Sequence, residues 1–326
     1  MDSVKKKSLA MVLGLALGMG FVAPTTALAD NKYVAITSIV EHPALDAFKD
    51  GVVEALDAEG FKQGENLRIK YQTAQSNTGT AAQIARQYIG EGPDVIVAIG
   101  TPSAQAVVAA TKSIPVVFGA ITDPVAAQLV KDRGPSGTNV TGMSDELPLK
   151  ASLELIKKTL PKAQKVGLVY NPGEINSKIV VEQLKVMMPE YGLTLVEAAA
   201  PRTVDVSSAA RNLVGKADVI FSTTDNNVIA TYESLTKVSL ASKLPLIASD
   251  TSSVERGAIA ALGVNYKQLG MQAGQMVARI LNGENPGDIA WETSDQLEIH
   301  LNKKIADQIG FEFSEELVES AEKVLE

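Results

Sequence analysis

The feature that most constrains the fold is an alternation of short apolar, β-rich segments with segments of helical periodicity, which begins near Tyr33. Short strands that alternate with helices predict a parallel sheet wound on both faces. In the first half the predicted strands are Tyr33–Thr37, Leu67–Tyr71, Asp94–Ile99 and Pro115–Gly119, and the predicted helices are Pro43–Glu59, Thr80–Gly90 and Pro102–Lys112.

The alternation then starts again with the same order and spacing. Its predicted strands are Lys165–Tyr170, Leu193–Ala198, Asp218–Ser222 and Leu244–Ala248, and its predicted helices are Leu149–Leu160, Ser177–Tyr191, Val206–Gly215 and Val228–Ser242. The tail predicts strands at Ala258–Val264 and Gln296–His300, a helix at Lys267–Leu281 and a last helix from Ser314. Little residue identity accompanies this repeat, so it is one of architecture. The sequence therefore predicts an α/β protein of two doubly wound parallel-sheet lobes joined by a hinge, without a long linker.

The first 29 residues are typical of a secretory signal. Lys5–Lys7 give a positive start, Ser8–Val22 are apolar or small, and Ala27-Leu28-Ala29 forms a cleavage motif before Asp30. The apolar run is short for the ~20 residues of a membrane span, which disfavours an uncleaved anchor. No cysteine follows the motif to carry a lipid. We expect cleavage between Ala29 and Asp30 and a soluble periplasmic product.

Composition excludes several functions. A net charge of −8 without a Lys/Arg stripe argues against nucleic-acid binding. The chain has no cysteine, which excludes disulfides, thiol nucleophiles and thiolate metal sites. It also lacks the His-Glu-x-x-His, Gly-x-Ser-x-Gly and phosphate-loop motifs. We therefore expect a binding protein without catalytic residues, metal or cofactor.

In open α/β sheets, ligands bind beyond the carboxyl ends of the strands. The residues that follow the predicted strands therefore form the candidate ligand site. In the first half these are Ser38, His42, Thr101, Pro102, Ser103, Ala120 and Thr122. In the second half they are Asn171, Thr224, Asp225, Ser249 and Asp250.

Gly100-Thr101-Pro102-Ser103 is the most informative of these segments. Thr101 fits a helix N-cap and Pro102 fits the first helical turn. We expect the backbone amides near Ser103 and Ala104 to point into the cleft beside two hydroxyls. A helix N-terminus of this kind favours an anion such as a carboxylate, although helix capping alone also explains these residue types.

Three further side chains have a binding interpretation and a structural one. Asp250 follows an apolar strand and is suited to pair with a ligand ammonium, but it also fits an N-cap or a solvated loop acid. Asp225 has the same alternatives. His42 either contacts the ligand or packs within its loop.

The sequence resembles the ABC transporter substrate-binding proteins of the tryptophan/tyrosine-binding type. The resemblance covers roughly Lys32 to the C-terminus. It rests on the export signal, the twin lobes and the strings Gly100-Thr101-Pro102-Ser103-Ala104-Gln105-Ala106, Gly119-Ala120-Ile121-Thr122-Asp123-Pro124, Asn171-Pro172 and Ser249-Asp250.

The resemblance implies the type I periplasmic-binding-protein fold, in which the chain crosses three times between the lobes. It implies a first lobe of residues 30–144 and 265–290, and a second of residues 145–264 and 291–326. Carried over by motif, Thr101 and Ser103 would hold the carboxylate of a free, aromatic amino acid, and Asp250 its ammonium.

The implied partners are an ABC permease and ATPase in the inner membrane, served by a monomeric binding protein. Family members are often lipoproteins, but the missing cysteine means that a lipid tether is not carried over. The alternatives are a sensor lobe, a protein for another solute such as a sugar, and a hydrolase on the same scaffold.

Overall fold

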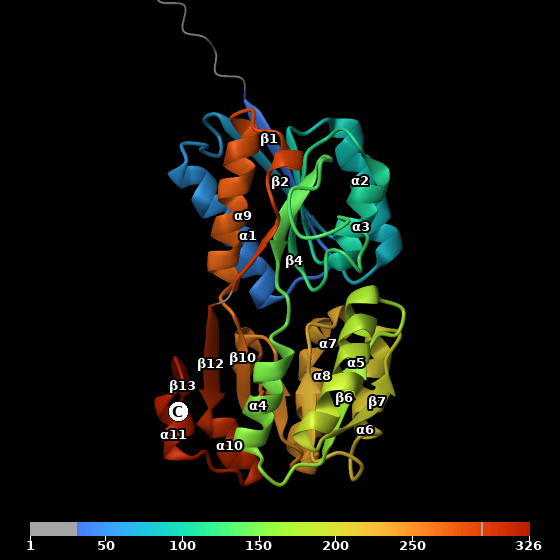
Figure 1. The fold of residues 1–326 in the computed structure, drawn as a ribbon, viewed down its shortest axis with the longest axis vertical. Helices are drawn as coiled ribbons and strands as arrows, with labels where there is room; N and C mark the ends of the chain where they lie inside the picture. The colour runs from blue at the N-terminus through green and yellow to red at the C-terminus, as the bar shows by residue number, and fades with distance from the viewer. Residues whose placement is uncertain (1–30, 295) are drawn as a thin grey trace, which may run out of the picture. The chain divides into compact units, whose positions relative to one another are not determined.

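The computed structural model describes residues 31–294 and 296–326 (Figure 1). The predicted export signal lies outside the described residues. Within them, six strands form a first sheet in the order β11-β5-β4-β3-β1-β2, with every pair parallel. These strands are β1 (Lys32–Ser38), β2 (Leu67–Thr73), β3 (Val95–Ile99), β4 (Val116–Ile121), β5 (Val140–Ser144) and β11 (Glu292–Thr293).

A second sheet of seven strands has the order β13-β12-β10-β9-β8-β6-β7 over the same described residues. The strands are β6 (Lys165–Tyr170), β7 (Thr194–Ala199), β8 (Val219–Ser222), β9 (Leu246–Ala248), β10 (Ala260–Val264), β12 (Leu297–Asn302) and β13 (Lys323–Leu325). β12 pairs antiparallel with β10, and the other pairs are parallel. The predicted pair of doubly wound α/β lobes is confirmed.

Helices cover both faces of each sheet, which is why central strands such as β3 are buried along their whole length. Beside the first sheet lie α1 (Pro43–Ala58), α2 (Thr78–Glu91), α3 (Thr101–Ala110), α9 (Tyr266–Leu281) and the 3₁₀ turn η4 (Pro286–Asp288). With the second sheet lie α4 (Leu149–Thr159), α5 (Ile175–Met187), α6 (Val206–Arg211), α7 (Asn226–Ala230), α8 (Tyr232–Ser242), α10 (Lys303–Ile309) and α11 (Glu315–Glu319), together with the 3₁₀ turns η1 (Met188–Tyr191), η2 (Thr203–Asp205) and η3 (Thr251–Val254). No helix in the described part of the chain is both long enough and apolar enough to cross a membrane.

Several elements depart from the sequence prediction. β5 was not predicted, because its sequence Val-Thr-Gly-Met-Ser has few large apolar residues. The helix predicted at Val228–Ser242 is two helices that break at Thr231. The predicted C-terminal helix is only the five residues of α11, and β13 follows it.

The chain passes from one sheet to the other three times: after β5, after β10 and after β11. The predicted boundary at residue 290 placed Glu292–Thr293 in the second lobe, whereas their pairing with β5 places them in the first sheet. Side-chain hydrogen bonds link the segments at and next to these passages. The Tyr266 hydroxyl donates to Asp145 Oδ2 at 2.6 Å, and the Thr141 hydroxyl donates to the Ile289 carbonyl at 2.9 Å.

The helix α9 returns to the first lobe and packs against α1 (Figure 1). Close approach requires glycine at the contact, since a Cβ on Gly270 would lie 2.0 Å from the Phe48 carbonyl oxygen. The Lys267 ammonium also contacts Glu54 Oε2 at 2.7 Å. This packing places Tyr266, the first residue of α9, beside the passages between the lobes.

Candidate ligand site

One cavity is bordered by residues of both lobes, with about 380 Å³ of space between atoms that includes space open to solvent. It lies where the carboxyl ends of the parallel strands lead into helices, the usual ligand position in such sheets. Its lining comprises His42, Ala44, Leu45, Gly100, Thr101, Ala120, Thr122 and Tyr266 from the first lobe, Asp145 from the passage that follows β5, and Asn176, Thr224, Asn226, Ile229 and Asp250 from the second lobe. The cavity thus brings together six of the predicted site residues: His42, Thr101, Ala120, Thr122, Thr224 and Asp250.

The N-terminus of α3 borders the cavity without a side-chain cap. Gly100, not Thr101, is the N-cap residue, which corrects the sequence prediction. Glycine is required there because φ is 83° and because a Cβ would lie 2.5 Å from Ile39 Cγ2. The predicted role of the Ala104 amide is also wrong, because that N–H donates to the Gly100 carbonyl at 3.0 Å. The amides of Thr101 and Ser103 belong to the first turn, which has no intrahelical acceptors, and are available to an anion.

His42 adds a second donor on this side of the cavity. It caps α1, and its Nδ1 accepts a hydrogen bond from the Ala44 amide at 3.2 Å. Burial lowers the pKa of the imidazole, so the ring is neutral and its proton resides on Nε2. Nε2 is buried and has no partner among the described residues. His42 therefore presents an unused N–H at the cavity.

Asp145 supplies an acceptor that sequence reasoning missed. It follows β5 and is almost fully buried. Its Oδ2 accepts from the Tyr266 hydroxyl, whereas Oδ1 has no partner within the described residues. Burial, reinforced by the nearby Asp250 carboxylate, raises the pKa of Asp145 to about 6. A cation in the cavity would relieve both effects.

Asp250 is a second acid at the cavity, and it also caps the 3₁₀ turn η3. Its Oδ1 accepts from the Ser253 amide at 3.1 Å and from the Ser252 hydroxyl, and its Oδ2 accepts from the Ser253 hydroxyl. A carboxylate has about four lone-pair sites, so these three bonds leave capacity for a ligand donor.

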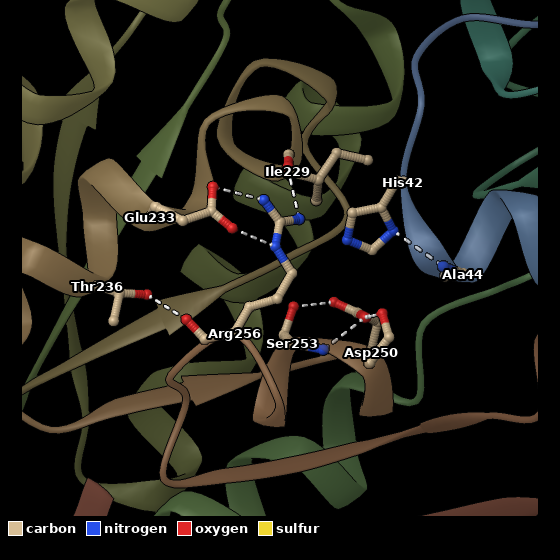
Figure 2. Close-up of polar contacts among 9 residues, drawn as sticks. His42, Ala44, Ile229, Glu233, Thr236, Asp250, Ser253 and Arg256 are labelled. Carbon is tan, nitrogen blue, oxygen red and sulfur yellow. Dashed lines mark hydrogen bonds and ion pairs between the residues drawn. The ribbon is translucent and has the colours of Figure 1, made fainter.

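Arg256 joins the two segments that follow β8 and β9, and Figure 2 shows it beside His42 and Asp250. Its Nη1 donates to the Ile229 carbonyl at 2.8 Å, and its Nε and Nη2 form a forked pair with Glu233 at 2.8 and 2.9 Å. The first bond satisfies a carbonyl at the end of α7, where helices leave such groups free. Arg256 therefore fixes the helix that carries the cavity residue Ile229.

Asp225 was also predicted as a ligand residue, but hydrogen bonds within the protein occupy its carboxylate. Its carboxylate caps α7 through the Asn227 and Val228 amides at 3.0 Å each. It also accepts from the Asn171 amide at 2.6 Å and from the Ser177 hydroxyl. These four donors account for its lone pairs, and it does not line the cavity.

The other predicted residues also lie outside the cavity lining. The Ser38 hydroxyl donates to the Val40 carbonyl at 2.8 Å, and Pro102 is buried in the first turn of α3. Asn171 donates to Glu174. Ser103 and Ser249 are buried, with hydroxyls that have no partner in the described part of the chain.

Sequence reasoning also missed Asn176, Asn226 and Tyr266 at the cavity and Glu174 behind it. Asn226 directly follows Asp225 in the sequence, so the rule that ligand residues follow strand ends could have predicted it as well. Burial, with the Asp225 carboxylate adding, raises the pKa of Glu174 to about 7. The described residues contain no group of three or more acids and histidines placed to hold a metal ion.

Two α/β lobes that share one cavity, lined by both unused hydrogen-bond donors and buried acids, define a protein that binds a small polar ligand between its lobes. Residues 33–325 match the family described as ABC transporter substrate binding protein. The chain belongs to this family, and it is therefore a substrate-binding protein and not an enzyme.

Three similar proteins illustrate that the chain belongs to this family. A tyrosine-binding protein from Clostridioides difficile is 40% identical over 301 residues, which cover 89% of this chain and 87% of that protein. A Streptococcus pneumonia structure in complex with L-Trp is 33% identical with a TM-score of 0.87, covering 91% of this chain and all of that one. A ligand-free, open substrate-binding protein with adhesive properties from Clostridium difficile is 42% identical with a TM-score of 0.69, covering 90% and 99%.

Proposed function

We propose that this protein binds a free aromatic amino acid, tyrosine or tryptophan, and delivers it to an ABC importer. The observation that carries the proposal is that one cavity has both a donor side and an acid side to offer a ligand, defined by the following residues. Donors lie at α3 and His42, and acceptors lie at Asp145 and Asp250. A zwitterion satisfies both sides at once.

The α-carboxylate belongs at the start of α3. The amides of the first turn have no intrahelical acceptors, Thr101 lines the cavity beside them, and the partial positive charge of the helix end also favours an anion there. His42 Nε2–H supplies a further donor. The α-ammonium belongs at Asp250 and Asp145, where it neutralises two buried acids that otherwise disfavour each other's charge.

The aromatic side chain belongs against the apolar part of the lining, which includes Leu45, Ile229 and the ring of Tyr266. Ligand pockets are mostly apolar with a few placed polar groups, and this lining follows that pattern. The names of the relatives support tyrosine and tryptophan as the ligands to test first.

Isothermal titration calorimetry of the purified mature protein tests this ligand assignment. We expect tyrosine or tryptophan to bind, and alanine, galactose and ribose to give no heat. Native mass spectrometry of protein that has not been dialysed should show the mass of the same amino acid. Binding of a sugar in place of an amino acid would overturn the assignment.

The import role implies an inner-membrane permease with its ATPase as partners, and a monomeric binding protein in the periplasm. Cleavage between Ala29 and Asp30 is part of this proposal. N-terminal sequencing of protein from the native host should begin at Asp30. Deletion of the gene should lower uptake of the labelled amino acid, and unchanged uptake would argue for a role other than import.

A further inference from the structure

Glu174 is a buried acid that lies behind the second-lobe side of the cavity and does not line it. Its Oε2 accepts a hydrogen bond from Asn226 Nδ2 at 2.5 Å, and its Oε1 accepts from Asn171 Nδ2 at 3.1 Å. Asn226 lines the cavity, whereas Asn171 does not. One carboxylate therefore holds two asparagine side chains, only one of which reaches the ligand site.

This contact determines which way the Asn226 amide points. An ionised carboxylate only accepts hydrogen bonds, so an asparagine that contacts it must turn its NH₂ group toward it. The Asn226 oxygen consequently faces the other way. Oδ1 lies 4.0 Å from the place that a Cβ on Gly100 would occupy, at the start of α3 in the opposite lobe.

We propose that Glu174 is a positioning residue that fixes Asn226 with its amide oxygen toward the ligand, where it accepts a hydrogen bond from the α-ammonium group. The inference rests on the proposed function, which places the carboxylate at the start of α3. The ammonium of an α-amino acid is one carbon away from that carboxylate. An acceptor beside Gly100 is therefore within reach of that ammonium as well, and it complements Asp145 and Asp250.

The first test replaces Glu174 by glutamine. A glutamine has one acceptor oxygen and one NH₂ group, so it satisfies only one of the two asparagines. Asn171 is held in place because its Oδ1 accepts from the Gly173 amide at 2.9 Å. In Glu174→Gln the Asn226 amide therefore turns and presents its NH₂ to the ligand cation. Affinity for tyrosine or tryptophan should fall about tenfold or more.

The titrations are done at pH 8, where the Glu174 carboxyl is ionised, and melting curves show that each variant is folded. Glu91→Gln is the matched control. Glu91 accepts hydrogen bonds from Tyr33, Lys70 and Gln87 in the first lobe, away from the cavity. This control should bind like the wild type. A folded Glu174→Gln variant with wild-type affinity would overturn the proposal.

Adding Asn226→Asp to Glu174→Gln gives a sharper test. The new carboxylate accepts from the glutamine NH₂ and again presents an acceptor oxygen to the ligand. The double variant should bind more tightly than Glu174→Gln alone, and the two substitutions should be strongly non-additive in a double-mutant cycle with Asn226→Asp. Additive effects would overturn the proposal.

If Glu174→Gln does not fold, Asn226→Ala tests the same contact. It should weaken binding of tyrosine but leave binding of 3-(4-hydroxyphenyl)propanoate, which lacks the ammonium, unchanged. Equal losses for both ligands would overturn the inference. A wild-type protein that binds no aromatic amino acid would instead overturn the proposed function, so the two failures are distinguishable.

Discussion

On the first-lobe side of the cavity the chain leaves donors unused: the uncapped start of α3 and Nε2 of His42. The acceptors at the cavity are Asp250 from the second lobe and Asp145, which follows β5 at the passage between the lobes. The contrast extends to how each side is held. The donors sit on backbone and on one neutral ring, whereas the acids depend on neighbours such as Tyr266 and Ser253 for their position.

This difference indicates where the ligand's binding energy is most sensitive to mutation. Backbone amides remain after any side-chain substitution, so the donor side should tolerate change. A buried acid loses its whole interaction when its charge is removed. We therefore expect substitutions on the acidic side to cost more than those at α3.

The largest effect should come from Asp250→Ala. It removes a charge-assisted hydrogen bond to the ligand ammonium, at a cost of about 1.5–3 kcal/mol, or roughly 10–150-fold in affinity. Asp250→Asn is the matched variant, since asparagine caps a helix about as well as aspartate and so separates loss of charge from loss of the η3 cap. Calorimetry with both variants measures the effect. Wild-type affinity in the asparagine variant would show that the charge is not used.

Asp145 should make binding depend on pH. Its pKa is about 6 in the ligand-free protein, so it is protonated below that pH, and an incoming ammonium favours the ionised form. Affinity for the amino acid should therefore fall as the pH drops below about 6, by up to about tenfold per pH unit. Asp145→Asn should bind more weakly at pH 8 and lose the part of this dependence that is centred near pH 6, while the part due to Glu174, whose pKa is about 7, remains. Titrations from pH 5 to pH 8 check both expectations.

The same substitution should make the ligand-free protein more stable. The folded-state pKa of Asp145 is raised, so the folded protein binds more protons than the unfolded chain between about pH 4 and pH 6, and stability falls as the pH rises through that range. At pH 7 the buried charge is therefore a cost of folding, and Asp145→Asn should raise the melting temperature. A lower melting temperature would show that the Asp145 carboxylate stabilises the fold, which would contradict this expectation.

His42→Asn should have a smaller effect on affinity. Asparagine keeps the cap on α1 but loses the Nε2 donor, a loss worth about 0.5–1.5 kcal/mol, or roughly two- to tenfold. Melting curves should match those of the wild type. An unchanged affinity would show that His42 does not donate a hydrogen bond to the ligand.

Thr101→Ala should have the smallest effect, about threefold or less, because the backbone amides at the start of α3 remain. Calorimetry under the conditions used for Asp250→Ala allows a direct comparison. A loss larger than that of Asp250→Ala would reverse the expected order of the two sides.

The sequence was sufficient to predict the two lobes and the edge of each sheet at which ligands bind, because strand–helix alternation and the strand-end rule act locally. Six of the predicted residues line the cavity. Asp145 was not predicted because it follows β5, a strand that the sequence does not indicate since its residues are mostly small or polar.

Asp225 and Asp250 show what a strand-end pattern cannot separate. Both follow apolar strands and both cap helical turns. Only the fold brings Asn171 and Ser177 to Asp225, where they satisfy its remaining lone pairs. Nothing in the neighbouring sequence of either acid carries that information, since Asn171 and Ser177 lie about 50 residues away along the chain.

The most direct test of the account compares tyrosine with tyrosine amide and 3-(4-hydroxyphenyl)propanoate in calorimetric titrations of the wild-type protein. The amide lacks the carboxylate expected at α3, and the propanoate lacks the ammonium expected at Asp145 and Asp250. Each analogue should bind at least about tenfold more weakly than tyrosine. An analogue that binds as tightly as tyrosine would contradict the assignment of the side of the cavity that it tests.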